Sequence, residues 1–166
     1  KIGTNFGFQP LNAGNLKNQF KSPMFFGISI ITPYELFPKN KLLSCKIGAS
    51  VDFANFSENE DSNLISDFKS TSITGFLYKK VLFVDLRGGV GMAFFKDSEG
   101  TSDSGLTLTG GMSLSLPIPI EKIDVRLNFD GAMVGDIWKD AIGYSLTSGI
   151  IDYFSFGLSC TYDLKM

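Results

Sequence analysis

Acids and bases recur at even spacings in three apolar segments of this 166-residue chain. Residues two apart in a β-strand point to the same side, so each segment would present its charges on one face. The charged residues of these faces are Lys46, Asp52, Asp85, Arg87, Asp124, Arg126 and Asp130. Buried charges must pair, because removing one partner leaves an uncompensated charge out of water. The pattern predicts an ion-pair network that fills the interior; the alternative is a narrow ion path along the same side chains.

A second group of ionisable residues lies in two stretches that hold seven acids and no base, residues 57–67 and 97–104. The candidates for a cation or partner contact are Glu58, Glu60, Asp61, Asp97, Glu99, Asp103 and, in the stretch GDIWKDA, Trp138. Clustered carboxylates suit hard divalent cations, but DSEGTSD lacks the closing glutamate of an EF-hand loop. Solvated acidic loops are the alternative, and the tryptophan is equally suited to anchoring at a membrane interface. We assign no definite metal site.

Several kinds of chemistry are excluded by composition. The chain has no histidine and no CxxC pair, which argues against zinc sites and against histidine-dependent catalysis. We therefore expect no catalytic residues, no enzyme activity and no cofactor. The net charge of −2 offers no basic surface, so we expect no nucleic-acid partner. The two cysteines, Cys45 and Cys160, fall on apolar faces of separate segments and are expected to stay free thiols.

The elements that must position these residues are strands, because apolar and polar residues alternate with period two along the whole chain. The expected strands cover residues 2–8, 24–31, 42–56, 70–79, 81–95, 105–116, 123–134 and 153–164. No helical periodicity of useful length interrupts them. We predict an all-β fold in one domain, residues 1–166.

The connections alternate between long and short. Residues 10–20, 56–69, 97–104 and 135–151 are long and polar, whereas residues 32–41, 79–80 and 117–121 are on average shorter and rich in Pro or Lys. A ninth candidate strand, residues 142–150, is assigned to the last long loop, where it could form a hairpin. Eight strands then place both termini beside the short turns, an arrangement typical of outer-membrane barrels.

The direction of the two faces follows from the stretch LTLTGGMSLSL, whose polar face carries only Thr, Gly and Ser. Small residues suit the crowded interior of an eight-stranded barrel, whereas a water-exposed face would carry more Lys and Glu. The charged fraction, 19%, is also below the roughly 25% of soluble domains. We predict that the apolar faces point outward to lipid. The alternative is a soluble barrel with the faces reversed, which would carry an apolar ligand.

Aromatic residues near the strand ends suggest two belts at the membrane interfaces. The belt beside the long loops is predicted to hold Phe6, Phe8, Phe53, Phe56, Phe94, Phe95, Tyr153 and Phe154. The belt beside the short turns is predicted to hold Tyr34, Phe37, Tyr78, Phe83 and Tyr162. A Phe-rich β protein with aromatic residues on every surface is the alternative.

Three strands carry a family resemblance in their order along the chain: an opening IGTNFGF, a glycine-bearing GGVGMAFF and a closing DYFSFGLSCTYDL. The series resembles the small eight-stranded outer-membrane β-barrels of the OmpX and OmpA transmembrane-domain type. The resemblance implies an up-and-down antiparallel transmembrane barrel with short periplasmic turns and long extracellular loops. It also implies insertion in the bacterial outer membrane and a polar core without a wide pore. It does not fix a function, because one fold serves many.

The expected function is therefore that of an integral outer-membrane barrel with a polar, ion-paired and largely closed lumen. A structural or surface-interaction role would run through the loops at residues 56–69, 97–104 and 135–151, with outer-membrane lipid and other surface proteins as partners. The protein could then be a subunit of a larger outer-membrane assembly. A narrow porin-like channel for small solutes is the alternative, followed by the soluble carrier. The start KIGTNFGF has no apolar signal core, so we expect a mature form from which a signal peptide has been removed.

Overall fold

The structure, a computed structural model, describes residues 1–13, 24–57, 67–98, 100, 102–118, 121–135 and 150–163. These residues form eight strands and no helix. The strands are β1 (Ile2–Ala13), β2 (Met24–Leu36), β3 (Cys45–Phe56), β4 (Phe68–Val81), β5 (Val84–Asp97), β6 (Ser102–Ser115), β7 (Ile123–Gly135) and β8 (Ile150–Tyr162). Within the described ranges, no helix is long and apolar enough to cross a membrane.

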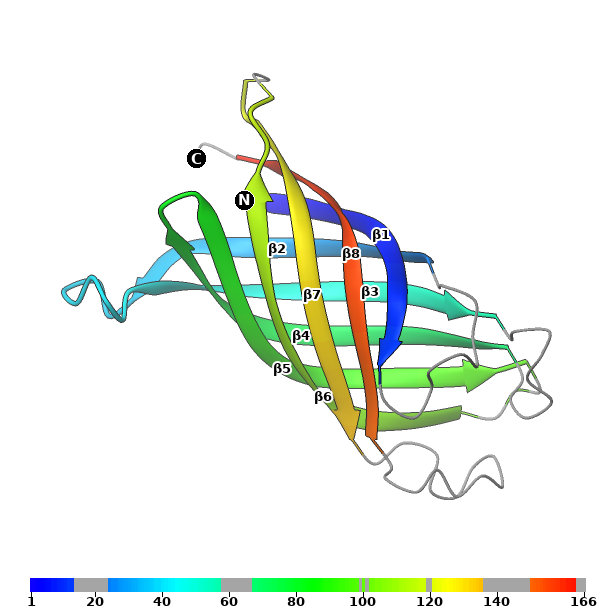
Figure 1. Cartoon of the computed structure of the whole chain (residues 1–166). Coiled ribbons are helices and arrows are strands. Elements are labelled where there is room, and N and C mark those ends of the chain that lie inside the picture. The colour runs from blue at the N-terminus through cyan, green and yellow to red at the C-terminus, as the bar shows by residue number, and fades with distance from the viewer. Residues whose placement is uncertain are drawn as a thin grey trace.

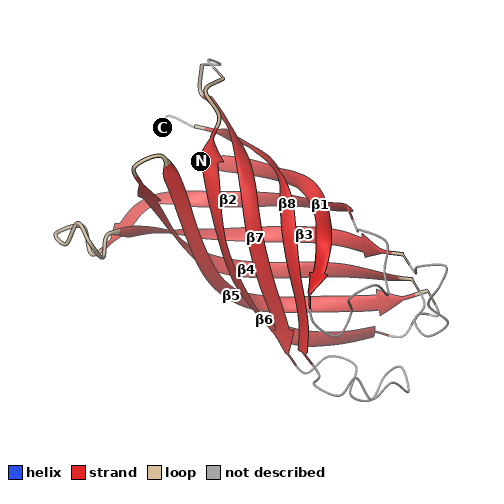
Figure 2. Ribbon diagram, viewed as in Figure 1, coloured by secondary structure: helices blue, strands red, loops and turns tan. Residues whose placement is uncertain are grey.

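Each strand pairs antiparallel with the next, and β8 pairs with β1 to close a barrel (Figure 1). The closing register runs from Ile2 opposite Tyr162 to Ala13 opposite Asp152. Both termini lie at the end of the barrel that carries the short turns, here called the short-turn end; the opposite end is the long-loop end (Figure 2). The predicted closed, eight-stranded, up-and-down barrel is confirmed.

The two faces of the strands are oriented as predicted. Large apolar side chains point outward, and Ile30, Val90 and Leu106 are 54%, 58% and 60% exposed. The buried positions between them hold small polar side chains, among them Ser29, Ser50, Ser72, Thr74, Thr107, Ser155, Ser159 and Thr161. A continuous apolar exterior around a polar interior matches a bilayer and not water. The reversed arrangement of a soluble carrier is therefore wrong.

The prediction of two aromatic belts is wrong for three residues. Phe56, Phe95 and Tyr78 are only 2%, 3% and 9% exposed, so they point into the barrel. Nearness to a strand end does not decide the face; the parity of the position along the strand does. The predicted belt residues that do point outward are Phe6, Phe53, Phe94 and Phe154 at the long-loop end and Tyr34, Phe37, Phe83 and Tyr162 at the short-turn end. The side chains of Phe8 and Tyr153 lie outside the described residues.

The turn predicted at residues 79–80 is also wrong. Both lysines belong to β4, where Lys80 stands opposite Asp85, and the chain turns at Leu82 and Phe83 instead. Leu82 takes a left-handed backbone conformation with φ 57°, which tight hairpin turns require but which sequence normally signals with Gly or Asn. Two apolar residues in this turn gave no such signal.

The strands differ in length from those predicted. β3 begins at Cys45 and not at residue 42, β4 starts at Phe68, and β6 ends before Leu116. The predicted loop at 97–104 shrinks, because Asp97 ends β5 and residues 102–104 belong to β6. β7 extends to Gly135, and β8 begins at Ile150, inside the predicted 135–151 loop. Apart from Ile150, the ninth candidate strand lies outside the described residues.

Candidate functional site: the barrel lumen

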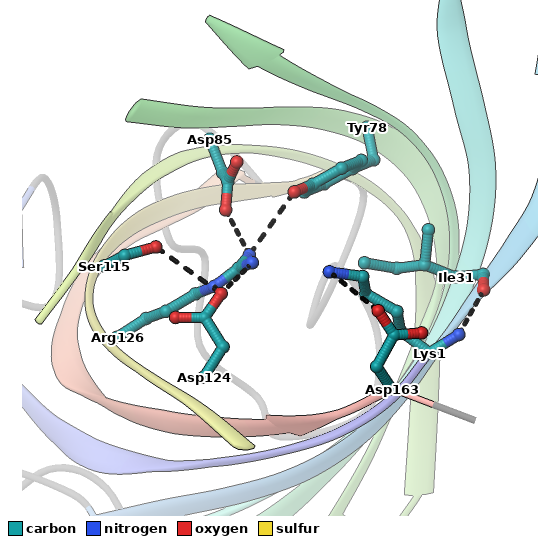
Figure 3. Close-up of polar contacts among 8 residues, drawn as sticks. All are labelled: Lys1, Ile31, Tyr78, Asp85, Ser115, Asp124, Arg126 and Asp163. Atoms are coloured by element: carbon teal, nitrogen blue, oxygen red, sulfur yellow. Dashed lines mark hydrogen bonds and ion pairs between the residues drawn. The ribbon is translucent and has the colours of Figure 1, made fainter. Parts of the chain in front are cut away.

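The most buried charges of the lumen gather around Arg126 near the short-turn end (Figure 3). Its guanidinium, with the side chain 4% exposed, forms ion pairs with Asp85 of β5 and with Asp124 of β7. The Arg126 Nε donates to Asp124 Oδ2 at 2.7 Å. Asp85 is equally enclosed, with a side chain 3% exposed, whereas Asp124 is 30% exposed. One cation thus balances a fully buried carboxylate and a partly solvated one.

Two further side chains complete this cluster. The Arg126 Nη1 donates to the Tyr78 hydroxyl at 3.4 Å, and the guanidinium carbon lies 6.0 Å from the centre of the Tyr78 ring. The Ser115 hydroxyl donates to Asp124 Oδ2, also at 3.4 Å. Tyr78 is predicted for the outer belt from its place near a strand end, although its parity with Thr74 and Phe76 along β4 indicates the inner face. That parity is the signal that could have found it.

A second ion pair joins Arg87 of β5 to Asp130 of β7. The contact is bidentate: Nε donates to Oδ1 at 2.8 Å and Nη2 to Oδ2. This pair is less enclosed than the first, with side chains 28% and 16% exposed. Asp52 lines the same cavity of about 70 Å³ as the pair, and its carboxylate accepts a hydrogen bond from Ser50 at 2.9 Å.

Glycines make room for this second pair. Arg87 and Asp130 both stand opposite Gly111 of β6, so the two side chains meet across the strand that separates them. A Cβ at Gly111 would collide with the Asp130 carboxylate, and a Cβ at Gly27 would collide with that of Asp52, its partner in the register. The inward glycines are therefore complementary in volume to the charged side chains beside them.

The lumen becomes apolar toward the long-loop end. Three large apolar side chains point inward near the long-loop ends of their strands and are at most 3% exposed: Phe56, Phe95 and Val134. Phe25 and the alanines at 54, 93 and 132 share this inward face and are 8% exposed or less. This apolar layer differs from the interior of small and polar residues that the sequence predicts. Large apolar side chains on both faces weaken the alternation at this end.

Two small cavities lie beside the buried ion pairs. The cavity beside Arg87 has a volume of about 70 Å³, and a second one beside Arg126 about 30 Å³. The buried atoms Thr74 Oγ1, Thr107 Oγ1 and Asn128 Nδ2 have no hydrogen-bond partner among the described residues. A water molecule needs a cavity of roughly 10–15 Å³ with polar partners. These two cavities are therefore large enough for a few water molecules.

The remaining predicted residues lie elsewhere. Lys46 faces the short-turn mouth of the barrel and forms no ion pair within the described ranges. Asp103 lies on β6, where its carboxylate accepts a hydrogen bond from the Ser104 amide at 2.7 Å. Glu58, Glu60, Asp61, Glu99 and Trp138 lie outside the described residues, as does the side chain of Asp97. In the part of the chain that is described, no group of three His, Cys, Asp or Glu could hold a metal ion.

Fold and lumen together define an eight-stranded transmembrane β-barrel of the outer-membrane type. No protein-family model matches the sequence, and no curated protein does either. Among solved structures, the chain is similar to the outer membrane protein Ail of Yersinia pestis, whose backbone structure was determined in a phospholipid bilayer nanodisc. The identity is 15%, the match covers 95% of this chain and 96% of Ail, and the TM-score is 0.54. At this identity the likeness concerns the fold.

Proposed function

We propose that this chain is an integral protein of the bacterial outer membrane that does not conduct solutes and acts through its surface. The observation that carries the proposal is the combination of an apolar exterior with a filled interior. Paired charges and an apolar layer occupy the middle of the lumen, where the cavities beside Arg87 and Arg126 have volumes of about 70 and 30 Å³. A barrel of this kind stays in the bilayer and has its ends available for contacts.

The long-loop end is the part that we assign to interaction. The sequence places seven acids and no base in residues 57–67 and 97–104, which would give this end a negative potential toward basic partners or bridging cations. Outer-membrane barrels carry short periplasmic turns and longer extracellular loops, which supports the orientation with this end outside the cell. The absence of histidine from the chain argues against an enzyme.

A labelling experiment tests the orientation. In a variant without native cysteines, Ser57→Cys introduces a thiol at the exposed end of β3, and Lys39→Cys one at the opposite end. On intact Gram-negative cells, a membrane-impermeant maleimide should label position 57 and spare position 39. Labelling of position 39 alone would show that the short-turn end lies outside the cell. Absence of the protein from the outer-membrane fraction would refute the proposed localisation.

A narrow channel is the second candidate, favoured by the buried Asn128 Nδ2, which lines the cavity of about 30 Å³ and has no hydrogen-bond partner among the described residues. Planar bilayers separate the two proposals. The closed barrel should leave a bilayer at its baseline conductance after verified insertion. Stable unitary currents would establish the channel.

A further inference from the structure

Two lysines stand side by side on the outer surface of the barrel near the long-loop end. Lys69 of β4 is opposite Lys96 of β5 in the antiparallel register, and both side chains are exposed. Residues in such a pair have Cβ atoms about 5 Å apart, and like charges at this spacing repel each other. Neither lysine forms an ion pair within the described ranges. An anion that contacts both ammonium groups would therefore stabilise this lysine pair.

A groove of about 580 Å³ lies over the lysine pair. Its lining combines two cations, three hydroxyl groups and one aromatic ring from positions of outward parity: Lys69, Lys96, Thr71, Ser102, Ser104 and Phe94. Phe95 and Asp103 complete the lining from alternate positions, which share the parity of the buried Ala93 and Thr107. The Asp103 carboxylate already accepts a hydrogen bond from the Ser104 amide. The outward groups of the groove therefore suit an anion that also accepts hydrogen bonds, such as a phosphate.

The apolar exterior begins directly below the groove, toward the middle of the barrel. On β4, β5 and β6, which are neighbours in the barrel (Figure 1), the next outward residue after Thr71, Phe94 and Ser104 is apolar. These residues are Ile73, Met92 and Leu106, which stand opposite one another in the register and are 52%, 40% and 60% exposed. Over three successive rows, the surface thus changes from lysines through hydroxyl groups and a phenyl ring to apolar side chains.

The aromatic belt gives the height of these rows relative to the bilayer. Phe94 is one of the outward aromatic residues at the long-loop end and is 45% exposed. Such residues form a girdle where the hydrocarbon core meets the headgroups. Lys96 lies two residues beyond Phe94 along β5, a rise of about 7 Å. Lys96, and Lys69 beside it, therefore lie at the height of the lipid headgroups.

We infer that the groove binds the headgroup of one anionic, phosphorylated lipid from the leaflet at the long-loop end. The phosphate would lie between Lys69 and Lys96, with Thr71 and Ser104 donating to the polar groups below it, and the acyl chains would run along the apolar row. A water-soluble anion would use the lysines but would gain nothing from that row. The inference rests on the membrane insertion proposed above and adds a lipid site with a defined charge preference.

The test is native mass spectrometry of protein extracted in mild detergent from phosphatidylcholine vesicles. The vesicles hold equal amounts of phosphatidic acid and diacylglycerol with the same acyl chains, so the two added lipids differ only in the phosphate. The wild type should retain one phosphatidic acid. Lys69→Gln/Lys96→Gln should lower its retention about 30-fold, the effect expected from two lysines near an anionic surface. Lys39→Gln/Lys41→Gln is the matched control: it removes two exposed lysines at the short-turn end and should retain the lipid.

Three results would overturn the inference: equal retention of both added lipids by the wild type, equal loss in the two double variants, or displacement of the lipid by soluble glycerol phosphate. The second result would show a general effect of charge, and the third a site for a free anion.

Heat-modifiable migration on gels, measured for every variant, monitors barrel formation separately. A wild type that migrates normally but shows no preference for phosphatidic acid would refute the lipid site alone. A wild type that fails to insert into the vesicles would refute the proposed membrane protein.

Discussion

Removal of the Arg126 guanidinium should destabilise the barrel more than removal of the guanidinium of Arg87, the other arginine of the lumen. In Arg126→Ala, Asp85 would remain as a carboxylate only 3% exposed and without its cation. Breaking a buried pair on one side costs about 3–5 kcal/mol. Asp124 adds about 1 kcal/mol or less, because its side chain is 30% exposed and stays partly solvated. We expect a loss of about 4 kcal/mol in the free energy of unfolding.

A double-mutant cycle separates the buried charge from the lost packing. Asp85→Asn removes the carboxylate, so the Arg126→Ala/Asp85→Asn variant should recover about 2–3 kcal/mol relative to Arg126→Ala alone. Arg87→Ala is the comparison at a more open site, where the pair is 28% and 16% exposed, and should cost less than Arg126→Ala. Urea titration of the vesicle-inserted protein, read by the folded and unfolded bands on a cold gel, gives the free energies of unfolding of the wild type and of each variant.

A loss of less than about 1 kcal/mol in Arg126→Ala, the level of an exposed pair, would show that Asp85 is not left as an unpaired buried charge. The absence of recovery with Asp85→Asn would show that the cost comes from lost packing and not from an unpaired charge.

Three further outcomes are expected. Phe95→Ala should cost about 3–5 kcal/mol by opening a cavity in the apolar layer, whereas its neighbour Phe94→Ala, 45% exposed on the lipid side, should cost clearly less in the same titration; equal losses would place both on one face. Gly157→Val should impede folding, because a Cβ there meets the backbone of β1, while Gly110→Val has open space and should refold normally from urea. Both cysteines should be alkylated in unreduced, denatured protein, since they lie on β3 and β8, which do not pair; an intramolecular disulfide seen by mass spectrometry would contradict this strand order.

Much of the fold could be predicted because a closed barrel constrains every residue of a strand to one of two environments. Alternation along segments such as residues 105–116 identified both the strands and the face that meets lipid. An even number of strands then placed the two termini at one end. These inferences depend on period and parity alone, which are properties of the sequence.

The pairs within the lumen could not be predicted in the same way. Arg87 meets Asp130 across Gly111, and Arg126 meets Asp85 across the same strand on a diagonal. The tilt of the strands and the register between them decide which inward side chains reach each other. The alternation in the sequence shows which charged residues face inward, but it does not show the register between strands. The set of inward charges could therefore be predicted, but not which acid pairs with which arginine.

The sequence by itself thus determined an all-β barrel, its lipid-facing exterior and the inward position of its charges, because two-residue periodicity is a local property. Only the tertiary structure decided that Tyr78 completes the Arg126 cluster and that aromatic rings fill the long-loop end. Each of these features depends on which side chains of neighbouring strands lie at the same height along the barrel axis. That height is set by the register between paired strands in the closed sheet, and no single segment of the sequence encodes it.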